Sequence, residues 1–207
     1  MTTQIPTASS AIDAILAQRA IPVVRAQSAT KALQICTSLI AADLGVIELT
    51  ATVPDWENVL RELRRTHPTA TIGLGTVTSV DIARRAIDLE ASFLVSPYPV
   101  HGLREGLEDT TVPLIGGGVT PGEIAEQSES GLCKLFPAHL GGTMYLKTLL
   151  AILPKARIMP TGGITVENAA EWIHAGAAAV GVGSDLYAAP DLETAIAKLR
   201  ASLRTMQ

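Results

Sequence analysis

Short apolar runs alternate with longer amphipathic segments along the chain. Each apolar run is a few residues long and rich in Val, Ile and Leu, which is typical of strands covered on both faces, as in parallel sheets. The runs occupy residues 21–26, 45–50, 70–76, 92–97, 112–118, 132–137, 157–163 and 178–184. The pattern therefore predicts eight parallel strands.

The amphipathic segments between these runs predict helices. They cover residues 30–44, 53–67, 79–91, 120–130 and 165–176, after the first, second, third, fifth and seventh strands. Several begin with Ser or Thr, which cap helix N-termini, and the last ends in Gly176, a residue type that often closes a helix. A further helix is predicted at 11–20, before the first strand.

This alternation predicts an α/β protein, a (β/α)8 TIM barrel with an extra N-terminal helix. The chain has 207 residues, which is near the lower limit for that fold, so its loops must be short. A doubly wound open sheet is the alternative architecture. The composition does not change abruptly along the chain, so we expect residues 1–207 to form a single domain.

Composition narrows the range of functions. Apolar residues make up 47% of the chain and the net charge is −4, which is typical of a compact globular protein. Without a basic stripe or an RNA-recognition motif, nucleic acid is not an expected partner. We expect no membrane span and no signal peptide, because no apolar run approaches about 20 residues and the N-terminus lacks a basic region. Two unpaired cysteines favour a cytoplasmic protein.

The histidines do not predict a metal centre. His67, His101, His139 and His174 are scattered, and no partner ligands fall at a useful spacing. We therefore expect neither a metal nor a cofactor. His139 follows the sixth strand and is expected near the mouth of the site.

The stretch GLCKLFPAHL (131–140) places Lys134 inside an apolar strand. A buried ammonium group is costly unless it has a partner or a chemical task. In barrels, active sites lie at the carboxyl ends of the strands, and residues two apart share a face. By this rule Arg25, Glu48 and Lys134 converge on the centre of the barrel.

We interpret Lys134 as a Schiff-base lysine. Apolar surroundings and a nearby cation both favour the neutral amine, which is the form that attacks a ketone. Arg25 is the candidate cation and can also grip a substrate carboxylate, while Glu48 is the candidate acid and base. The alternatives are structural: an ion pair between Lys134 and Glu48 that serves packing, and a salt bridge from Arg25 to Glu48.

Two glycine-rich strand ends predict a phosphate site. PTGGIT (160–165) follows the seventh strand and GVGSDL (181–186) follows the eighth. In barrels, phosphate often binds at these two positions, where glycine allows the backbone N–H groups to approach the anion. IGGGVT (115–120) is interpreted as a tight strand-to-helix turn that is also a candidate substrate contact.

Taken together, these stretches resemble the 2-keto-3-deoxy-6-phosphogluconate and 4-hydroxy-2-oxoglutarate aldolases, class I pyruvate aldolases of the Entner–Doudoroff type. The resemblance runs in family order over residues 21–187. It rests on PVVRA (22–26), IELTATVPD (47–55), GLGTVTS (73–79), FLVSP (93–97), KLFPA (134–138), PTGGIT (160–165) and AVGVGSDL (179–186).

The resemblance implies a homotrimeric (β/α)8 barrel and a role for each matching residue. Its Schiff-base lysine corresponds to Lys134, and its proton-shuttling glutamate corresponds to Glu48. The implied substrate-binding residues are Arg25, Thr76, Pro97, Phe136 and Thr161, and the implied phosphate-binding residues are Gly162, Gly163, Gly183 and Ser184. The sequence departs from many family members at Thr52, where some have arginine, and at His139, where many have an acidic residue.

The predicted activity is cleavage of 2-keto-3-deoxy-6-phosphogluconate to pyruvate and glyceraldehyde 3-phosphate. The expected partners are this small-molecule substrate and further copies of the chain. One alternative is an aldolase for 4-hydroxy-2-oxoglutarate or a related 2-keto-3-deoxy (phospho)sugar acid. Two others are a phosphosugar isomerase or epimerase and a catalytically silent assembly subunit.

Overall fold

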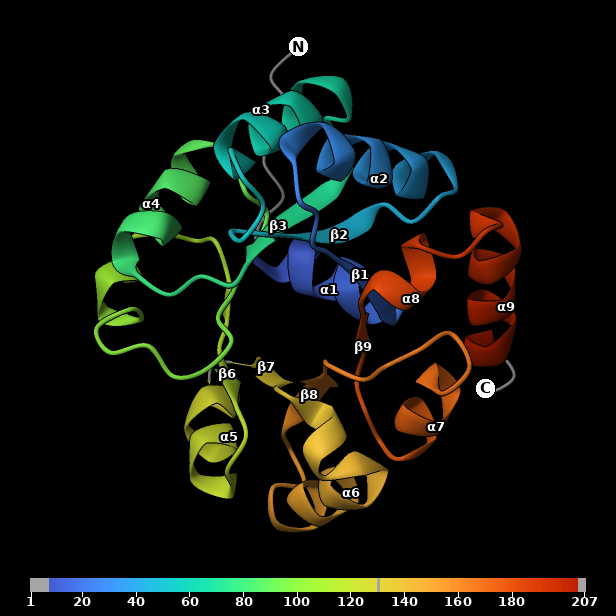
Figure 1. The fold of residues 1–207 in the computed structure, drawn as a ribbon. Helices are drawn as coiled ribbons and strands as arrows, with labels where there is room; N and C mark the ends of the chain where they lie inside the picture. The colour runs from blue at the N-terminus through green and yellow to red at the C-terminus, as the bar shows by residue number, and fades with distance from the viewer. Residues whose placement is uncertain (1–7, 130, 205–207) are drawn as a thin grey trace.

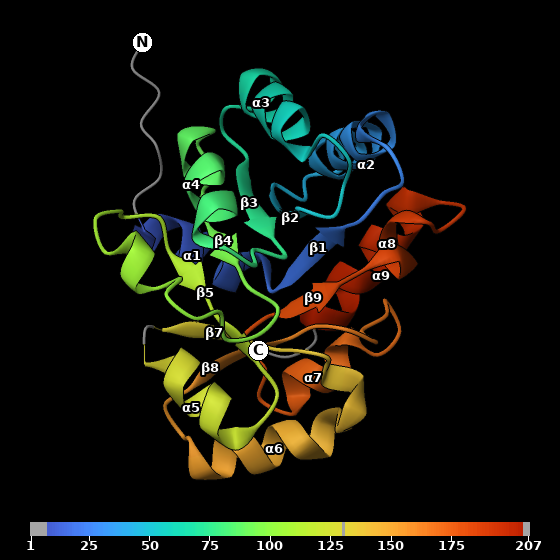
Figure 2. The same ribbon diagram turned by 60° about the vertical axis from the view of Figure 1, so that its left-hand side comes forward.

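A computed structural model describes residues 8–129 and 131–204. The start of the stretch examined for a signal peptide and the last residue of the helix predicted at 120–130 lie outside these ranges. The structure is an α/β fold in which a curled parallel sheet is surrounded by helices (Figures 1 and 2). In the described residues, no helix combines the length and apolar character needed to cross a bilayer.

The strands follow the predicted order. They are β1 (Ala20–Val24), β2 (Val46–Thr50), β3 (Thr71–Gly75), β4 (Leu94–Val95), β5 (Leu114–Ile115), β6 (Gly117–Gly118), β7 (Leu132–Leu135), β8 (Arg157–Pro160) and β9 (Val180–Val182). One sheet has the order β5-β4-β3-β2-β1-β9 and the other β6-β7-β8, with parallel pairing throughout. Each predicted strand region contains a strand, and the fifth is divided into β5 and β6.

The two sheets are joined at both of their edges. Only Gly116 separates β5 from β6, and its carbonyl oxygen accepts a hydrogen bond from the Lys134 N–H at 2.8 Å. At the other edge, a parallel bridge between Thr161 and Gly181 connects the end of β8 to β9. Strand pairing therefore continues from one sheet into the other.

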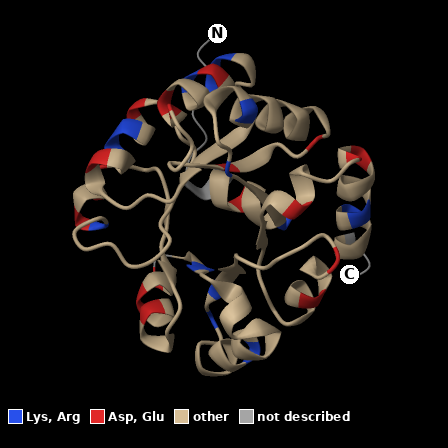
Figure 3. Cartoon of the chain, in the orientation of Figure 1, with Lys and Arg blue, Asp and Glu red and all other residues tan. Residues whose placement is uncertain are grey.

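Most helices lie outside the strands, and α1 lies across the amino end of the curled sheet (Figure 1). The helices are α1 (Ala8–Gln18), α2 (Ala29–Ala41), α3 (Trp56–Thr66), α4 (Val80–Asp88), α5 (Pro121–Ser128), α6 (Gly142–Ile152), α7 (Ala169–His174), α8 (Ser184–Tyr187) and α9 (Leu192–Arg204), with short 3-10 turns η1 (Glu105–Leu107) and η2 (Ala138–Leu140). Figure 3 shows that most charged residues lie on these outer helices. Every predicted helical segment contains a helix, whereas α6, α8 and α9 were not predicted.

Local hydrogen bonds explain where several helices begin. The Ser28 and Ser79 hydroxyls accept backbone N–H groups three residues later, at 3.2 Å in each case. At α5, Thr120 and Glu123 form a reciprocal capping box, with Pro121 as the first helical residue. These caps fix the direction in which each strand-to-helix loop leaves the sheet.

The core has two layers. The larger layer lies between the strands and the outer helices. The smaller layer fills the inside of the curled sheet with residues from the first halves of the strands, such as Ile21, Val46 and Leu132, and includes Ala11 and Ile15 of α1. The helix α1 therefore covers the amino end of this inner layer. Inside the sheet, polar side chains lie toward the carboxyl ends of the strands.

Candidate active site

Lys134 and Glu48 form a buried pair inside the curled sheet. Lys134 lies in β7 and is 2% exposed, and Glu48 lies in β2 and is fully buried. The Lys134 Nζ donates to Glu48 Oε1 at 3.1 Å and contacts Oε2 at 3.4 Å. Each residue follows an inner-core residue by two positions, Leu132 and Val46 respectively. The strand period therefore directs both side chains inward, as the sequence predicted.

A glycine on the neighbouring strand makes room for the Glu48 carboxylate. Gly75 is the last residue of β3, and its register partner is Thr50, two residues after Glu48. A Cβ atom at position 75 would lie 2.6 Å from Glu48 Cγ and closer still to Oε1. The GLG stretch of β3 thus provides the space in which the acidic side chain meets the lysine.

Phe136 contacts the buried pair, and Thr161 lies at the end of the neighbouring strand β8, where its N–H donates to the Leu135 carbonyl oxygen at 3.0 Å. The Lys134 Nζ lies 5.5 Å from the centre of the Phe136 ring. Thr161 is 5% exposed, and its Oγ1 has no hydrogen-bond partner among the described residues. Gly181 faces this hydroxyl, because a Cβ there would overlap Oγ1. A buried hydroxyl without a partner is costly, so it offers a hydrogen bond to a bound molecule.

A cavity of about 410 Å³ lies beside Phe136 and Thr161, and neither Lys134 nor Glu48 is among the residues that line it. Seven predicted site residues line it: Arg25, Phe136, Thr161, Gly162, Gly163, Gly183 and Ser184. Gly162 and Gly163 have φ values of 94° and 78°, in the left-handed region that favours glycine. The cavity therefore brings the two predicted glycine-rich strand ends together.

Arg25 does not reach the barrel centre as predicted, and the structural alternative, a salt bridge from Arg25 to Glu48, is not found among the described residues. Arg25 is exposed at the edge of the cavity. The strand register gives the reason. Glu48 lies beside Val23, and β1 ends at Val24, so Arg25 lies one inward-facing position nearer the mouth.

Thr76 and Pro97 lie at the carboxyl ends of β3 and β4 and do not line this cavity. Thr76 has a φ of 59°, which is unusual for a β-branched residue and marks local backbone strain. The main chain of Pro97 packs against Gly117, since a Cβ at Gly117 would lie 2.6 Å from the Pro97 carbonyl carbon. Gly117 is the register partner of Lys134, so Pro97 packs against the β6 residue that lies beside the lysine.

Three further residues lie at the mouth of the cavity. His139 is exposed beside the glycine turn, and its N–H donates to the Gly162 carbonyl oxygen at 3.1 Å. Asp185 and Tyr187 of α8 line the cavity, although the sequence analysis did not select them. The available signal was their position, since Asp185 follows Ser184 directly and Tyr187 lies one helical turn after it.

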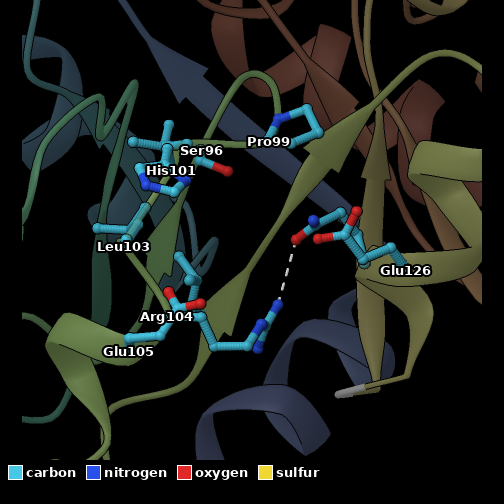
Figure 4. Close-up of a pocket in the computed structure, with 11 residues that line it drawn as sticks. Ser96, Pro99, His101, Leu103, Arg104, Glu105 and Glu126 are labelled. Carbon is cyan, nitrogen blue, oxygen red and sulfur yellow. Dashed lines mark hydrogen bonds between the residues drawn. The ribbon is translucent and has the colours of Figure 1, made fainter.

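A second cavity, of about 290 Å³, lies outside the sheet (Figure 4). It lies between α5 and the β4–β5 connection, where η1 replaces a full helix. Arg104 reaches across it and donates to Gln127 Oε1 at 3.1 Å, as the dashed line in Figure 4 shows. None of the predicted site residues lines this cavity. Among the described residues, no group of three or more His, Cys, Asp or Glu is placed to hold a metal ion.

A buried amine beside a carboxylate, at the carboxyl ends of parallel strands, defines an α/β enzyme suited to covalent chemistry on a carbonyl carbon. The chain belongs to the KDPG and KHG aldolase family, whose model matches residues 12–198. It is accordingly an aldolase, a carbon–carbon lyase.

Relatives and solved structures agree with this assignment. The 2-dehydro-3-deoxy-6-phosphogalactonate aldolase of Escherichia coli K12 is 32% identical over 177 residues, which are 82% of this chain and 84% of that protein. The 2-dehydro-3-deoxy-phosphogluconate aldolase of Pseudomonas aeruginosa is 31% identical over 75% and 72% of the two chains. A KDPG aldolase structure from Legionella pneumophila, with pyruvate captured as a covalent carbinolamine, has a TM-score of 0.77 and 28% identity over 92% and 95% of the chains.

Proposed function

We propose that this aldolase cleaves 2-keto-3-deoxy-6-phosphogluconate to pyruvate and glyceraldehyde 3-phosphate through a Schiff base on Lys134. The observation that carries the proposal is the 3.1 Å contact between the Lys134 Nζ and Glu48 inside the sheet. Because both groups are buried, a proton released by the ammonium has an acceptor at hand without entering bulk water. The Legionella structure, in which pyruvate is held covalently, supports the same chemistry.

The first half of the reaction makes the imine. Lys134 passes a proton to Glu48, and the neutral amine attacks the C2 carbonyl carbon of the substrate to form a carbinolamine. Glu48 then returns the proton to the C2 hydroxyl, which leaves as water. The product is a protonated imine, whose positive nitrogen can accept an electron pair.

The second half breaks and resolves the carbon skeleton. Glu48, or a water that it holds, takes the proton of the C4 hydroxyl as the C3–C4 bond breaks. The bonding electrons move to the imine nitrogen, which gives an enamine, and glyceraldehyde 3-phosphate leaves. Glu48 protonates the enamine at C3, and water hydrolyses the imine to pyruvate and free Lys134.

We assign substrate binding to the residues around the pair. Phe136, Thr76 and Pro97 enclose the pyruvate part, and the partnerless hydroxyl of Thr161 supplies a hydrogen bond to it. Arg25, at the edge of the cavity, attracts an anionic group of the substrate. The four phosphate-binding positions proposed are Gly162, Gly163, Gly183 and Ser184, all of which line the same cavity.

The main alternative substrates share the pyruvate part and differ beyond it. The phosphogalactonate aldolase of Escherichia coli supports a C4 epimer of the substrate. The name of another relative, a KHG/KDPG aldolase that is 28% identical, supports a non-phosphorylated substrate, 4-hydroxy-2-oxoglutarate. Comparing kcat/KM for the two phosphorylated epimers and for the non-phosphorylated acid ranks them. Equal values with and without phosphate would exclude the phosphate role of the glycine turns.

We also propose that the curled sheet is a closed (β/α)8 barrel with α1 as its extra N-terminal helix, in one domain. The chain continuity across Gly116 and the Thr161–Gly181 bridge support closure. We propose a homotrimer, supported by the similarity of this chain to a protein cage designed from symmetric oligomeric domains, with a TM-score of 0.78. The buried, free Cys36 and Cys133 support a cytoplasmic location. Light scattering after size exclusion tests the trimer.

The decisive experiment is borohydride reduction in the presence of pyruvate, followed by peptide mass mapping. We expect a reduced pyruvyl adduct on Lys134 in the wild type and none in Lys134→Met. The matched control is Lys147→Met, which removes an exposed lysine of α6 and should leave the adduct intact. A folded protein that forms no adduct on Lys134 excludes the Schiff base. Cleavage activity retained in Lys134→Arg would favour isomerase-type acid and base chemistry.

A further inference from the structure

The carboxyl end of β1 extends beyond the residues that pair with β9. β9 pairs with Ala20, Ile21 and Pro22 and then ends at Val182. The chain continues beyond this pairing to Arg25, whose main-chain N–H and carbonyl groups lie at the exposed edge of the cavity, outside the β1–β9 ladder.

Tyr187 of α8 supplies a hydrogen-bond partner for both groups. Its Oη accepts a hydrogen bond from the Arg25 N–H at 3.1 Å and donates to the Arg25 carbonyl oxygen at 3.2 Å. The phenol oxygen thereby makes the two main-chain hydrogen bonds that a neighbouring strand would otherwise make. On the other side, the Thr50 hydroxyl donates to the Val24 carbonyl oxygen at 2.9 Å. Figure 1 shows α8 beside the carboxyl end of β1, where this contact is made.

The Tyr187 hydroxyl thus holds the main chain of a residue whose side-chain charge is not neutralised. Among the described residues, no carboxylate forms an ion pair with Arg25. Arg25 and Tyr187 line the same cavity as Gly183 and Ser184. Tyr187 is one helical turn after Ser184, so the phenol ties the glycine-rich end of β9 to the main chain that carries the guanidinium.

We propose that Tyr187 is a positioning residue for substrate binding. Its hydroxyl fixes the main chain of Arg25 so that the guanidinium stays at the cavity edge where the anionic group of the substrate binds. The inference rests on the proposed function, because it requires Arg25 to bind that group. Tyr187 has no part in the covalent steps at Lys134.

The test is a double-mutant cycle with Tyr187→Phe and Arg25→Met, measured by steady-state cleavage of 2-keto-3-deoxy-6-phosphogluconate. Loss of the hydroxyl removes both hydrogen bonds to the Arg25 main chain, which water can partly replace at this exposed position, so we expect Tyr187→Phe to raise KM about fivefold. The kcat should stay within about twofold, since the reacting groups are untouched. In the Arg25→Met background, Tyr187→Phe should have no further effect on KM, because the side chain that it positions is absent.

Tyr145→Phe is the matched control. The Tyr145 Oη also donates to a main-chain carbonyl oxygen, that of Val119 at 2.6 Å, and Tyr145 does not line the cavity. A similar loss of melting temperature in both tyrosine variants, with a KM change only in Tyr187→Phe, supports positioning. An unchanged KM in Tyr187→Phe, or an effect that persists in Arg25→Met, overturns it.

The same series separates this inference from the proposed function. If Arg25→Met leaves KM unchanged, Arg25 does not bind substrate and the inference fails, while a pyruvyl adduct on Lys134 still supports the aldolase mechanism. If borohydride traps no adduct on Lys134 in any variant, the proposed mechanism itself fails.

Discussion

Replacing Gly75 with alanine is expected to inactivate the enzyme by displacing Glu48. The added Cβ would lie 2.5 Å from Glu48 Cδ and 2.6 Å from Cγ, and closer to Oε1. These are the three nearest atoms, and all of them belong to one side chain. The φ of Gly75 lies outside the left-handed region, so alanine is compatible with the backbone and the conflict is one of space.

The size of the effect on kcat/KM follows from the loss of the contact between the Glu48 carboxylate and Lys134. Overpacking of a well-packed interior costs about 1–3 kcal/mol, so most of the protein should remain folded. Relief of the overlap requires Glu48 to rotate away from the Lys134 Nζ, which breaks the 3.1 Å contact. Loss of a positioned acid and base costs about 100-fold to 10,000-fold in rate. We expect kcat/KM of Gly75→Ala to fall by at least about 100-fold.

The assay is coupled cleavage kinetics with chemical denaturation on the same samples. The control is Gly45→Ala, just before β2, where a Cβ would meet nothing within 4 Å. In a Glu48→Ala background the overlapping atoms are gone, so the stability cost of Gly75→Ala should shrink toward zero. A folded Gly75→Ala enzyme with kcat/KM within about threefold of the wild type would refute the reasoning, since Glu48 would then work from another position.

Three further predictions concern single groups. Thr161→Val should leave the free energy of unfolding unchanged or raise it by about 1 kcal/mol, because Oγ1 has no partner among the described residues, while lowering kcat/KM about tenfold. Burial raises the pKa of the Cys36 and Cys133 thiols to about 12, so a disulfide reagent at pH 8 should label neither thiol in the folded protein and both in urea. Hydrogen bonds from the Thr120 N–H, the neighbouring N–H and the Thr120 hydroxyl lower the pKa of Glu123, so its stabilisation is present above the ordinary glutamate pKa of about 4.3 and is lost as pH falls through the lowered value. The unfolding free energy lost in Glu123→Ala, about 1 kcal/mol near neutrality, should therefore shrink below about pH 4, and a constant difference down to pH 2 would contradict this.

The sequence predicted the strands well because each is buried on both faces. A strand covered by helices outside and by the inner core must be apolar at nearly every position, which makes it visible as a continuous run. Lys134 was conspicuous for the same reason, since it interrupts such a run. The division of the fifth strand at Gly116 was not predicted. It depends on main-chain hydrogen bonds to neighbouring strands, and these leave no mark in the pattern of apolar residues.

Two long helices were missed, for different reasons: α6 lacks a distinct amphipathic pattern, whereas α9 has one, with Ile196, Leu199 and Leu203 buried along one face, and was passed over. The sequence of α6, GTMYLKTLLAI, is apolar over most of its length, with Gly rather than Ser or Thr at its N-cap, so it lacks both helix signals. The β4–β5 connection has the reverse character. It contains helix-forming residues but forms only η1, because Pro97, Pro99, Gly102 and Gly106 interrupt the segment with residues that disfavour a helix.

The misplacement of Arg25 has a specific physical cause. The two-residue period correctly gives the face of a strand residue, and it assigned Lys134 and Glu48 to the interior. It does not say how far along the barrel axis a residue lies, because that height depends on the stagger between strands. Glu48 lies beside Val23, so Arg25 is at the rim although it belongs to the same inward-facing series.

That stagger separates two kinds of substrate contact. Lys134 and Glu48 lie deep enough that removing one leaves the other buried without a partner, at a cost of about 3–5 kcal/mol, so chemistry and stability are coupled there. Arg25 lies in water at the mouth, where an unpaired charge costs little, and can change without endangering the fold. Residues proposed to recognise the variable end of the substrate should therefore tolerate substitution, whereas the pair proposed to make the imine should not. A saturation library screened for folded protein should accordingly be depleted at positions 48 and 134 and not at position 25, even before any selection for activity.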